Sequence, residues 1–323
     1  MYSNFSARAL GLNLTAAESI GLAAAAGFDA VELPVRDLVL AGSDASRLRA
    51  KMDDLGLRGG TWPLPVDWRN DAQRFARDLQ RLDSYAEAAA ILGLTRTGTW
   101  VMPETTANPV TDFERAMHLA ETAARHVRRL GAIARVLDRH GIRFGLEVIG
   151  VASSRTGRGL PFVHRLADFD RVLGALWNEA PNVGILLDGF HLYAAGEGYE
   201  AGLAWGVGRV VAVHVADLPA TADANRAAIN DQQRGLPGEN GAIDSRELLT
   251  QLARQGYDGP VTAEPMAGCR SLSGRSPESS ARLVAAALQA VWPSTGSLQR
   301  EVDQARRPSL LPLTGPSPAH AGS

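Results

Sequence analysis

The stretch Gly256-Tyr-Asp-Gly-Pro-Val-Thr-Ala-Glu264 decides the fold class of this chain. Its first glycine follows a run with helical periodicity, and a glycine in that place closes a helix because it accepts the left-handed conformation. The apolar residues from Pro260 to Ala263 come next and indicate a buried parallel strand. The strand ends on a carboxylate, Glu264, which is a polar group at the carboxyl end of an apolar run.

The same helix–glycine–strand pattern recurs along the chain, and this indicates a repeated unit of strand and helix. It occurs at Gly27-Phe28-Asp29, Gly56-Leu57-Arg58, Gly93-Leu94-Thr95 and Gly141-Ile142-Arg143. Two helix starts carry a capping box, in which a threonine caps the backbone and a glutamate reaches back. They are Thr15 with Glu18, and Thr111 with Glu114. Helices that alternate with strands predict a parallel sheet.

Eight strands are expected, near residues 8–13, 30–35, 57–63, 96–102, 143–149, 183–188, 209–215 and 260–264. Helices are expected near 15–26, 43–55, 70–92, 111–140, 166–178, 199–205, 244–255 and 277–291. Eight such units predict an α/β fold, a (β/α)8 TIM barrel that forms a single domain over residues 1–292. An open doubly wound sheet is the alternative, but no Gly-x-Gly-x-x-Gly turn follows the first expected strand. Residues 293–323 are rich in proline, serine and glycine, which predicts a disordered tail; the alternative is an arm packed on a partner subunit.

Composition excludes several classes of protein. The 323 residues carry 33 basic and 35 acidic side chains, and a net charge of −2 argues against a nucleic-acid binder. No apolar run is long enough to predict a membrane span, and the N-terminal residues lack the apolar run of a signal peptide. The one cysteine, Cys269, forms no internal disulfide and favours a reducing, cytoplasmic location. Lys51 is the one lysine, so imine chemistry is disfavoured.

Four ligand-type side chains lie in or at the end of the last four expected strands. They are Glu147, Asp188, His214 and Glu264. Three carboxylates and an imidazole are costly to bury without partners, and a divalent cation removes that cost. Oxygen and imidazole ligands together suit Mn²⁺, Mg²⁺, Co²⁺ or Zn²⁺. Each residue alone could be an ion-paired or core residue, but four of them on consecutive strands favour a metal site.

A second group of residues is expected to line a substrate pocket. His191 follows Asp188 by three residues and could turn over the pocket mouth, although it could also be an ordinary loop histidine. Arg234 lies in the long loop from 231 to 244, where it could bind a hydroxyl, carboxylate or phosphate group; Arg226 is its rival, and either could be a surface residue.

Asp217 and Trp62 complete the expected substrate pocket. Asp217 could orient His214 or contact substrate, and its alternative is a turn or helix-capping role. Trp62 ends the third strand and could stack on a sugar face, with core packing as its alternative. Trp100 and Glu32 are pocket candidates on similar grounds.

These motifs resemble the xylose-isomerase-like TIM-barrel superfamily of sugar isomerases and epimerases, over about residues 8–292. The resemblance is carried by five motifs: Leu146-Glu147, Asp188-x-x-His191, Val213-His214-Val-Ala-Asp217, Arg234-x-Leu-Pro-Gly238-Glu239 and Gly256-Tyr-Asp-Gly-Pro260-Val-Thr-Ala-Glu264-Pro. It implies one divalent metal, with Mn²⁺ favoured, held by the four residues at the strand ends. It also implies Glu147 and Glu264 as an acid/base pair that removes a proton beside a metal-bound carbonyl and returns it through an enediolate.

The activity expected from the resemblance is metal-dependent isomerisation or epimerisation of a sugar, keto-sugar or cyclitol. A keto-inositol dehydratase, which is a lyase, is the alternative, because elimination starts with the same proton abstraction. A non-catalytic barrel that binds a sugar or a partner is a third hypothesis, but it predicts a missing ligand. DNA-repair members of the superfamily bind several metals through many histidines, whereas only His191 and His214 lie at strand ends here. Homo-oligomerisation is left open.

Overall fold

The computed structural model of the chain describes residues 1–222 and 225–294. In this part of the chain the strands are β1 (Tyr2–Phe5), β2 (Ala30–Val31), β3 (Arg58–Gly59), β4 (Thr61–Pro63), β5 (Arg96–Trp100), β6 (Arg143–Glu147), β7 (Val183–Asp188), β8 (Val210–Val215) and β9 (Pro260–Ala263). The α-helices are α1 (Ala16–Ala26), α2 (Val35–Leu40), α3 (Ala45–Asp54), α4 (Ala72–Ile91), α5 (Asp112–Asp138), α6 (Asp170–Glu179), α7 (Gly189–Ala195), α8 (Tyr199–Leu203), α9 (Ser245–Arg254) and α10 (Pro277–Val291).

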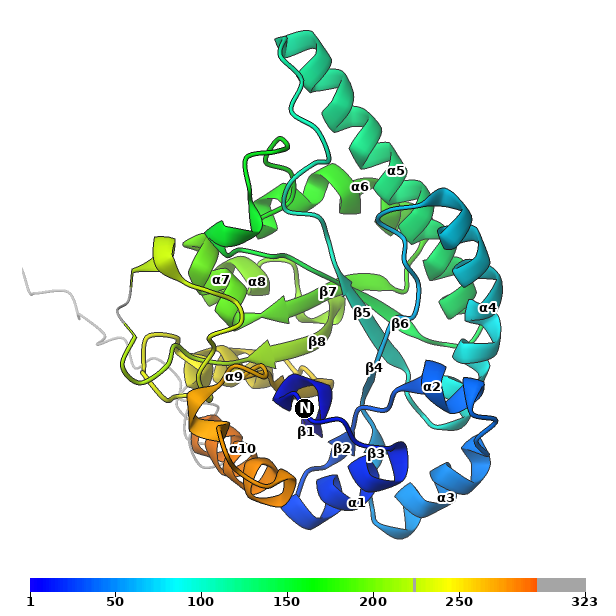
Figure 1. Cartoon of the computed structure of the whole chain (residues 1–323), viewed down its shortest axis with the longest axis vertical. Coiled ribbons are helices and arrows are strands. Elements are labelled where there is room, and N and C mark those ends of the chain that lie inside the picture. Colours follow the sequence, from blue (N-terminus) through cyan, green and yellow to red (C-terminus); the bar gives the residue numbers. More distant parts are fainter. Residues whose placement is uncertain (223–224, 295–323) are drawn as a thin grey trace, which may run out of the picture. The chain divides into compact units, whose positions relative to one another are not determined.

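The strands pair in parallel and curve into a barrel that helices surround (Figure 1). The pairing order is β3-β2-β1-β9-β8-β7-β6-β5-β4, and every pair is parallel. The two strands at the ends of this order, β3 and β4, are separated in the sequence by Gly60 alone. The sheet is therefore nearly closed, and the predicted TIM barrel is confirmed.

Gly60 explains why nine short strands replace the eight that the sequence predicts. A Cβ atom on Gly60 would lie 1.7 Å from the side-chain oxygen of Asn4, so only glycine lets the chain pass this close to β1. The third expected strand, 57–63, is interrupted at this point and forms β3 and β4. The two pieces occupy one position in the barrel, where β3 pairs with β2 and β4 pairs with β5.

The first strand was predicted wrongly at residues 8–13. The strand is Tyr2–Phe5, and the chain turns through a short 3₁₀ helix at Arg8–Leu10. Asn4 made this strand hard to detect because it is a polar residue in the barrel interior. Its amide nitrogen donates to the hydroxyls of Thr262 (2.9 Å) and Thr61 (3.3 Å), which satisfies both N–H groups inside the barrel.

The helices lie close to their expected positions, and their starts have the expected caps. Both capping boxes, at Thr15 and Thr111, are formed. Two helices were not expected: α2 occupies the end of the expected second strand, and α7 follows β7 without a loop. None of the described helices is both long and apolar enough to cross a membrane. Residues Met1–Trp292 form one compact unit, and the expected disordered tail, 293–323, lies outside the described residues from position 295 onward.

One buried histidine makes the stability of the barrel depend on pH. His126 on α5 is fully buried between the rings of Trp68 and Phe162, whose centroids lie 5.0 and 4.9 Å away. Its Nδ1 lies 2.7 Å from the carbonyl oxygen of Thr122, while its Nε2 has no partner. Burial lowers the pKa of His126 to about 4. The neutral ring is therefore the form that fits the folded protein.

We predict that His126→Phe reduces the loss of stability on acidification. The unfolded chain binds a proton at His126 below about pH 6.5 and the folded chain only near pH 4, so unfolding becomes easier as the pH falls through this window. By pH 5 this histidine should cost about 2 kcal/mol. Denaturant unfolding of both proteins at pH 7 and pH 5 measures the difference; equal pH dependence would contradict the assignment.

Candidate metal centre

Glu147, Asp188, His214 and Glu264 meet at the carboxyl ends of four neighbouring strands. One ligand atom from each lies within 4.8 Å of every other. Glu147 ends β6, Asp188 ends β7, His214 is on β8, and Glu264 directly follows β9. Asp188 pairs with His214, and His214 pairs with Thr262, which lies two residues before Glu264. Residues paired across strands share a face of the sheet, as do alternate residues of one strand, so these side chains all point into the barrel.

His214 lies between the two glutamates. Its Nδ1 is 3.0 Å from Oε2 of Glu264 and 3.6 Å from Oε1 of Glu147. This nitrogen is buried, and no described group takes a well-directed hydrogen bond with it. Burial disfavours the charged ring, but Glu264 and Glu147 outweigh burial and raise the pKa of His214 well above its ordinary value. A buried nitrogen that faces two carboxylates without a hydrogen bond suits a bound cation.

The two glutamates have pKa values that are shifted in opposite directions. Burial raises the pKa of Glu147. Burial also acts on Glu264, but the charges of His214, Arg234 and Arg8 outweigh it and hold the pKa of that carboxyl well below its usual range. The centre thus contains one carboxyl group that favours its proton and one that favours ionisation.

Arg234 connects the long loop after β8 to the centre. Its side chain is buried, and Nη1 donates to Asp188 Oδ2 (2.8 Å) and to Glu264 Oε2 (3.1 Å). Nη2 lies 3.0 Å from His191 Nε2 and 2.6 Å from Asp231 Oδ1. The structure therefore brings Arg234 and His191 to the four-residue cluster. Asp231 joins them, although no sequence pattern selects it by itself.

Asp188 also fixes helix α7. Its Oδ1 accepts the backbone N–H groups of Phe190 (2.7 Å) and His191 (3.2 Å), so the side chain caps the helix start. This cap carries His191 into the barrel mouth as a buried helical residue, where the sequence left open a loop histidine. Burial raises the pKa of Asp188, but Arg234 and His191 outweigh this effect and lower it.

Two other expected pocket residues are placed elsewhere. Trp62 is buried in the hydrophobic core, and its neighbour Thr61 faces the barrel interior, where it bonds Glu32. Since successive side chains alternate across a strand, Trp62 points out of the barrel toward the helices. Asp217 is fully buried and accepts four backbone N–H groups. They come from Leu218 and Ile243 on Oδ1, and from Asn240 and Gly241 on Oδ2. Its contacts are those of a loop anchor.

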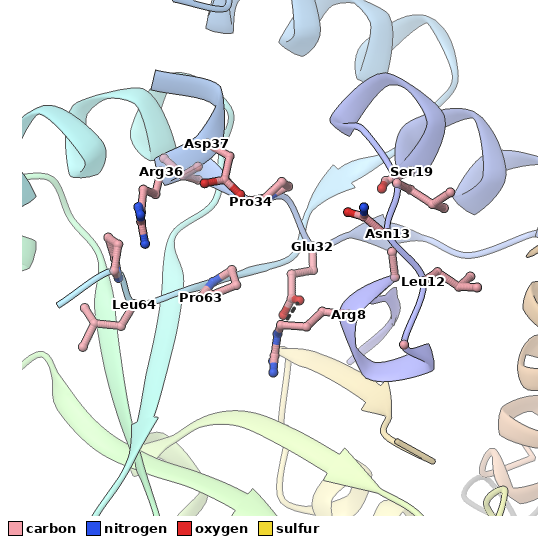
Figure 2. A pocket seen from close by; sticks show the side chains of 15 residues that line it. Arg8, Leu12, Asn13, Ser19, Glu32, Pro34, Arg36, Asp37, Pro63 and Leu64 are labelled. Atoms are coloured by element: carbon pink, nitrogen blue, oxygen red, sulfur yellow. Dashed lines mark hydrogen bonds and ion pairs between the residues drawn. The ribbon is translucent and has the colours of Figure 1, made fainter. Parts of the chain in front are cut away.

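Arg8 is a site residue that the sequence reasoning missed, because residues 8–13 were expected to form a strand. Its Nη2 lies 4.0 Å from Glu264 Oε1, and its Nε lies 3.4 Å from Glu32 Oε1. Figure 2 shows Arg8 and Glu32 meeting in a cavity of about 480 Å³ that is also lined by Asn13, Arg36 and Pro63. Glu32 is held by Ser6 (2.7 Å) and Thr61 (3.0 Å). Arg8 thus connects Glu264 with an open cavity.

A second cavity, of about 550 Å³, borders the other side of the centre. Its lining includes Trp100, Met102, Ile149 and Asp231. Trp100 is the strand neighbour of Glu147, and the guanidinium of Arg69 stacks 3.5 Å from the centre of its ring. The sequence selected both Trp100 and Glu32 as pocket candidates, and both line cavities.

The donor set fits a divalent metal. Three carboxylates and one imidazole are the ligands that Mn²⁺, Mg²⁺, Co²⁺ and Zn²⁺ accept in proteins. The buried Nδ1 of His214, which faces two carboxylates without a well-directed hydrogen bond, gives this fit a basis in the structure itself. Glu147, Asp188, His214 and Glu264 are the residues that would hold the ion.

We predict that Asp217→Asn destabilises the protein by about 2 kcal/mol or more, because an amide group would face two buried N–H donors that lose a charged acceptor. Denaturant unfolding measures this loss, and hydrogen exchange at Asn240 and Gly241 should rise. Asp258→Asn is the control, since that side chain is 86% exposed and its pair with Arg96 should contribute little. Equal stability of the two variants would contradict the anchor role of Asp217.

Solved structures of other proteins share this fold. A xylose isomerase domain protein from Alicyclobacillus acidocaldarius subsp. acidocaldarius is 27% identical, with a TM-score of 0.76 over 93% of this chain and 99% of that one. The IolI protein with a bound zinc atom is 18% identical, with a TM-score of 0.71 over 90% and 98%. D-Psicose 3-epimerase with D-tagatose, from Clostridium cellulolyticum H10, is 17% identical, with a TM-score of 0.62 over 90% and 98%.

No curated protein sequence matches the chain significantly. The model of one protein family matches residues 20–290, which is most of the barrel, and that family is described as the xylose isomerase-like TIM barrel. The match spans the strands that carry all four residues of the cluster. The chain therefore belongs to the xylose isomerase-like TIM-barrel family.

Proposed function

We propose that this protein is a divalent-metal-dependent isomerase or epimerase of a small sugar, keto-sugar or cyclitol. One observation carries the proposal: Glu147 and Glu264 reach the same four-residue cluster on either side of His214. Two carboxyl groups in one site are suited to act as base and acid in successive proton transfers. Such a pair fits a reaction in which one group takes a proton and another returns it.

The chain's own residues supply the proton transfer and the binding of substrate. A divalent cation, when bound, acts as a Lewis acid that stabilises negative charge developing on a substrate oxygen. One glutamate removes a proton from the carbon beside the carbonyl, which gives an enediolate, and the other donates a proton. Return to the opposite face of the same carbon gives an epimer. Return to the neighbouring carbon, together with transfer of the hydroxyl proton from one oxygen to the other, gives an isomer.

Substrate binding is assigned to donors around the cluster. Arg234 and His191 lie against the ligand carboxylates, and Arg8 lies between Glu264 and the cavity in Figure 2. A guanidinium offers several donors in a fixed plane, which suits hydroxyl and carbonyl oxygens of a sugar. The epimerase with D-tagatose shares this fold, and ketoses therefore come first among the substrates to test.

Three further inferences accompany this proposal. Mn²⁺ is our first choice of metal, and the zinc atom in the IolI protein makes Zn²⁺ the next to test. The near-neutral charge supports a small-molecule substrate without a nucleic-acid partner. Cys269 is a free thiol in the folded protein, which supports a cytoplasmic location.

The proposed reaction predicts how its product is labelled in D₂O. Incubation with Mn²⁺ and a panel of ketoses and keto-inositols in D₂O should give an isomer of the substrate in which deuterium replaces hydrogen at the carbon beside the carbonyl. Glu147→Gln and Glu264→Gln should each lower kcat by at least about 100-fold, because each removes a proton-transfer group. Glu179→Gln, on the exposed surface, is the control.

Mass spectrometry separates the outcomes. A product that has lost water would replace the isomerase proposal with the keto-inositol dehydratase. Wild-type turnover in either glutamine variant would rule out the paired-glutamate mechanism for the isomerase and for the dehydratase.

The four-residue ligand set also predicts the metal content of the protein. Elemental analysis after loading and gel filtration should find one divalent ion per wild-type chain, and His214→Ala should retain much less, since it removes the imidazole ligand. His140→Ala is the matched control because His140 pairs with Asp83 on the surface. Full metal content in the His214 variant would contradict the ligand set.

A further inference from the structure

The first part of α5 projects beyond the barrel (Figure 1). The buried residues of this helix begin at Thr122, so residues 112–121 contain none. At 1.5 Å per residue this segment extends by roughly 15 Å. It has a defined start, because Thr111 and Glu114 form a capping box and Arg115 donates to the carbonyl of Pro109 (2.9 Å). We call residues 110–124 the α5 arm.

The α5 arm exposes large apolar side chains that the barrel does not use. Val110 is 88% exposed, Phe113 76% and Met117 47%. Val110 and Phe113 are the two most exposed among the large apolar residues of the described chain. Exposing several large apolar side chains to water costs free energy, and an exposed apolar patch of this kind marks an interaction surface.

Within the helix the exposed apolar side chains form one stripe. Phe113, Met117, Ala120 and Ala124 follow one another at spacings of four, three and four residues, and Val110 lies just before the helix, ahead of its cap Thr111. This is the spacing of the seam between two paired helices. Thr122 and His126, which face the barrel, lie on the opposite side of the helix. The stripe is therefore directed away from the protein's own core.

The stripe is complementary to itself when two copies run antiparallel. Its large residues, Phe113 and Met117, lie toward the tip, and its small residues, Ala120 and Ala124, lie toward the base. Antiparallel pairing places Phe113 of one copy against Ala124 of the other, and Met117 against Ala120. Large side chains then fill the space that small ones leave, as ordinary helix packing requires. A parallel pair would instead place large residues against large ones.

The charges beside the stripe follow the same pattern. Asp112 and Glu114 lie at the start of the helix, and Arg125 and Arg128 lie three to four turns further on. Two antiparallel copies bring the acidic start of each arm toward the basic part of the other. Opposite charges along the edge of a helix pair favour that orientation. A two-fold axis needs such a self-complementary surface.

We propose that the α5 arm is a dimerisation surface whose partner is a second copy of this chain, related by a two-fold axis near residues 118–119. The interface is a short helix pair, and small interfaces are typical of complexes that dissociate on dilution. This inference does not depend on the proposed reaction.

The oligomeric state tests the proposal directly. Sedimentation equilibrium of the full chain between about 1 and 100 µM should show a reversible monomer–dimer equilibrium. Phe113→Glu should weaken association at least tenfold, because it places one acidic group from each copy in the apolar seam of the dimer, and Phe113→Leu should largely retain it. Leu40→Glu is the control, since Leu40 is 59% exposed on α2. Circular dichroism and a thermal melt confirm that each variant is folded.

Two results would overturn the proposal. One is a monomer at every concentration; the arm would then bind a partner other than a second copy of this chain. The other is a dimer that Phe113→Glu does not weaken, which would place the interface elsewhere.

Cross-linking tests the antiparallel register. A mixture of the Met117→Cys and Ala120→Cys proteins should form a disulfide-linked dimer faster than either protein alone, because these positions face each other across the axis. The natural Cys269 is buried and should not react, which the wild-type protein controls. Equally fast cross-linking of Met117→Cys alone would indicate a parallel pair and contradict the proposal.

Discussion

The centre of this protein depends on how the charges of three carboxylates, two of them buried and one partly buried, and a buried histidine are balanced. Glu147, Asp188 and Glu264 lie within a few ångströms of one another at the mouth of a barrel. Carboxylates this close repel each other and lose their hydration, so they need positive charge around them. Arg234 supplies it by bridging Asp188 and Glu264, and His214 supplies it from between the two glutamates. A divalent cation held by these four residues would take over the positive charge of the His214 ring, because a histidine binds a metal in its neutral form.

This electrostatic requirement also organises the surrounding loops. Arg234 arrives on the long segment after β8, and Asp217 anchors that segment by accepting four backbone N–H groups. Asp188 caps α7 and so brings His191 to Arg234. Arg8 reaches Glu264 from the opposite side, where it is held by Glu32. The charged side chains in and around the centre therefore also position the chain around the two cavities.

The sequence predicted those features that follow from local pattern. Glycine-terminated helices and apolar runs located most of the strands, and polar residues at the ends of those runs located the four residues of the cluster. Features that depend on packing were missed. The first strand was not predicted at Tyr2–Phe5 because it contains the polar residue Asn4, whose partners are far away in the sequence. The strand was expected at residues 8–13 instead, and Arg8 was therefore assigned to it. Trp62 was assigned to the pocket because it ends an expected strand. Whether a strand residue faces the pocket or the helices depends on the register of the strand, which its own sequence does not reveal. Gly60 shows that a close approach between strands leaves no local signal beyond the glycine itself.

The most direct measurement of the central claim is an anomalous difference map from crystals of the protein soaked in Mn²⁺. We expect one strong peak among Glu147, Asp188, His214 and Glu264, with ligand atoms at about 2.0–2.3 Å. Arg234 should remain beside the cluster and donate to its carboxylates. A map with no peak there, with Arg234 alone compensating Asp188 and Glu264, would contradict the claim that these four side chains form a metal centre.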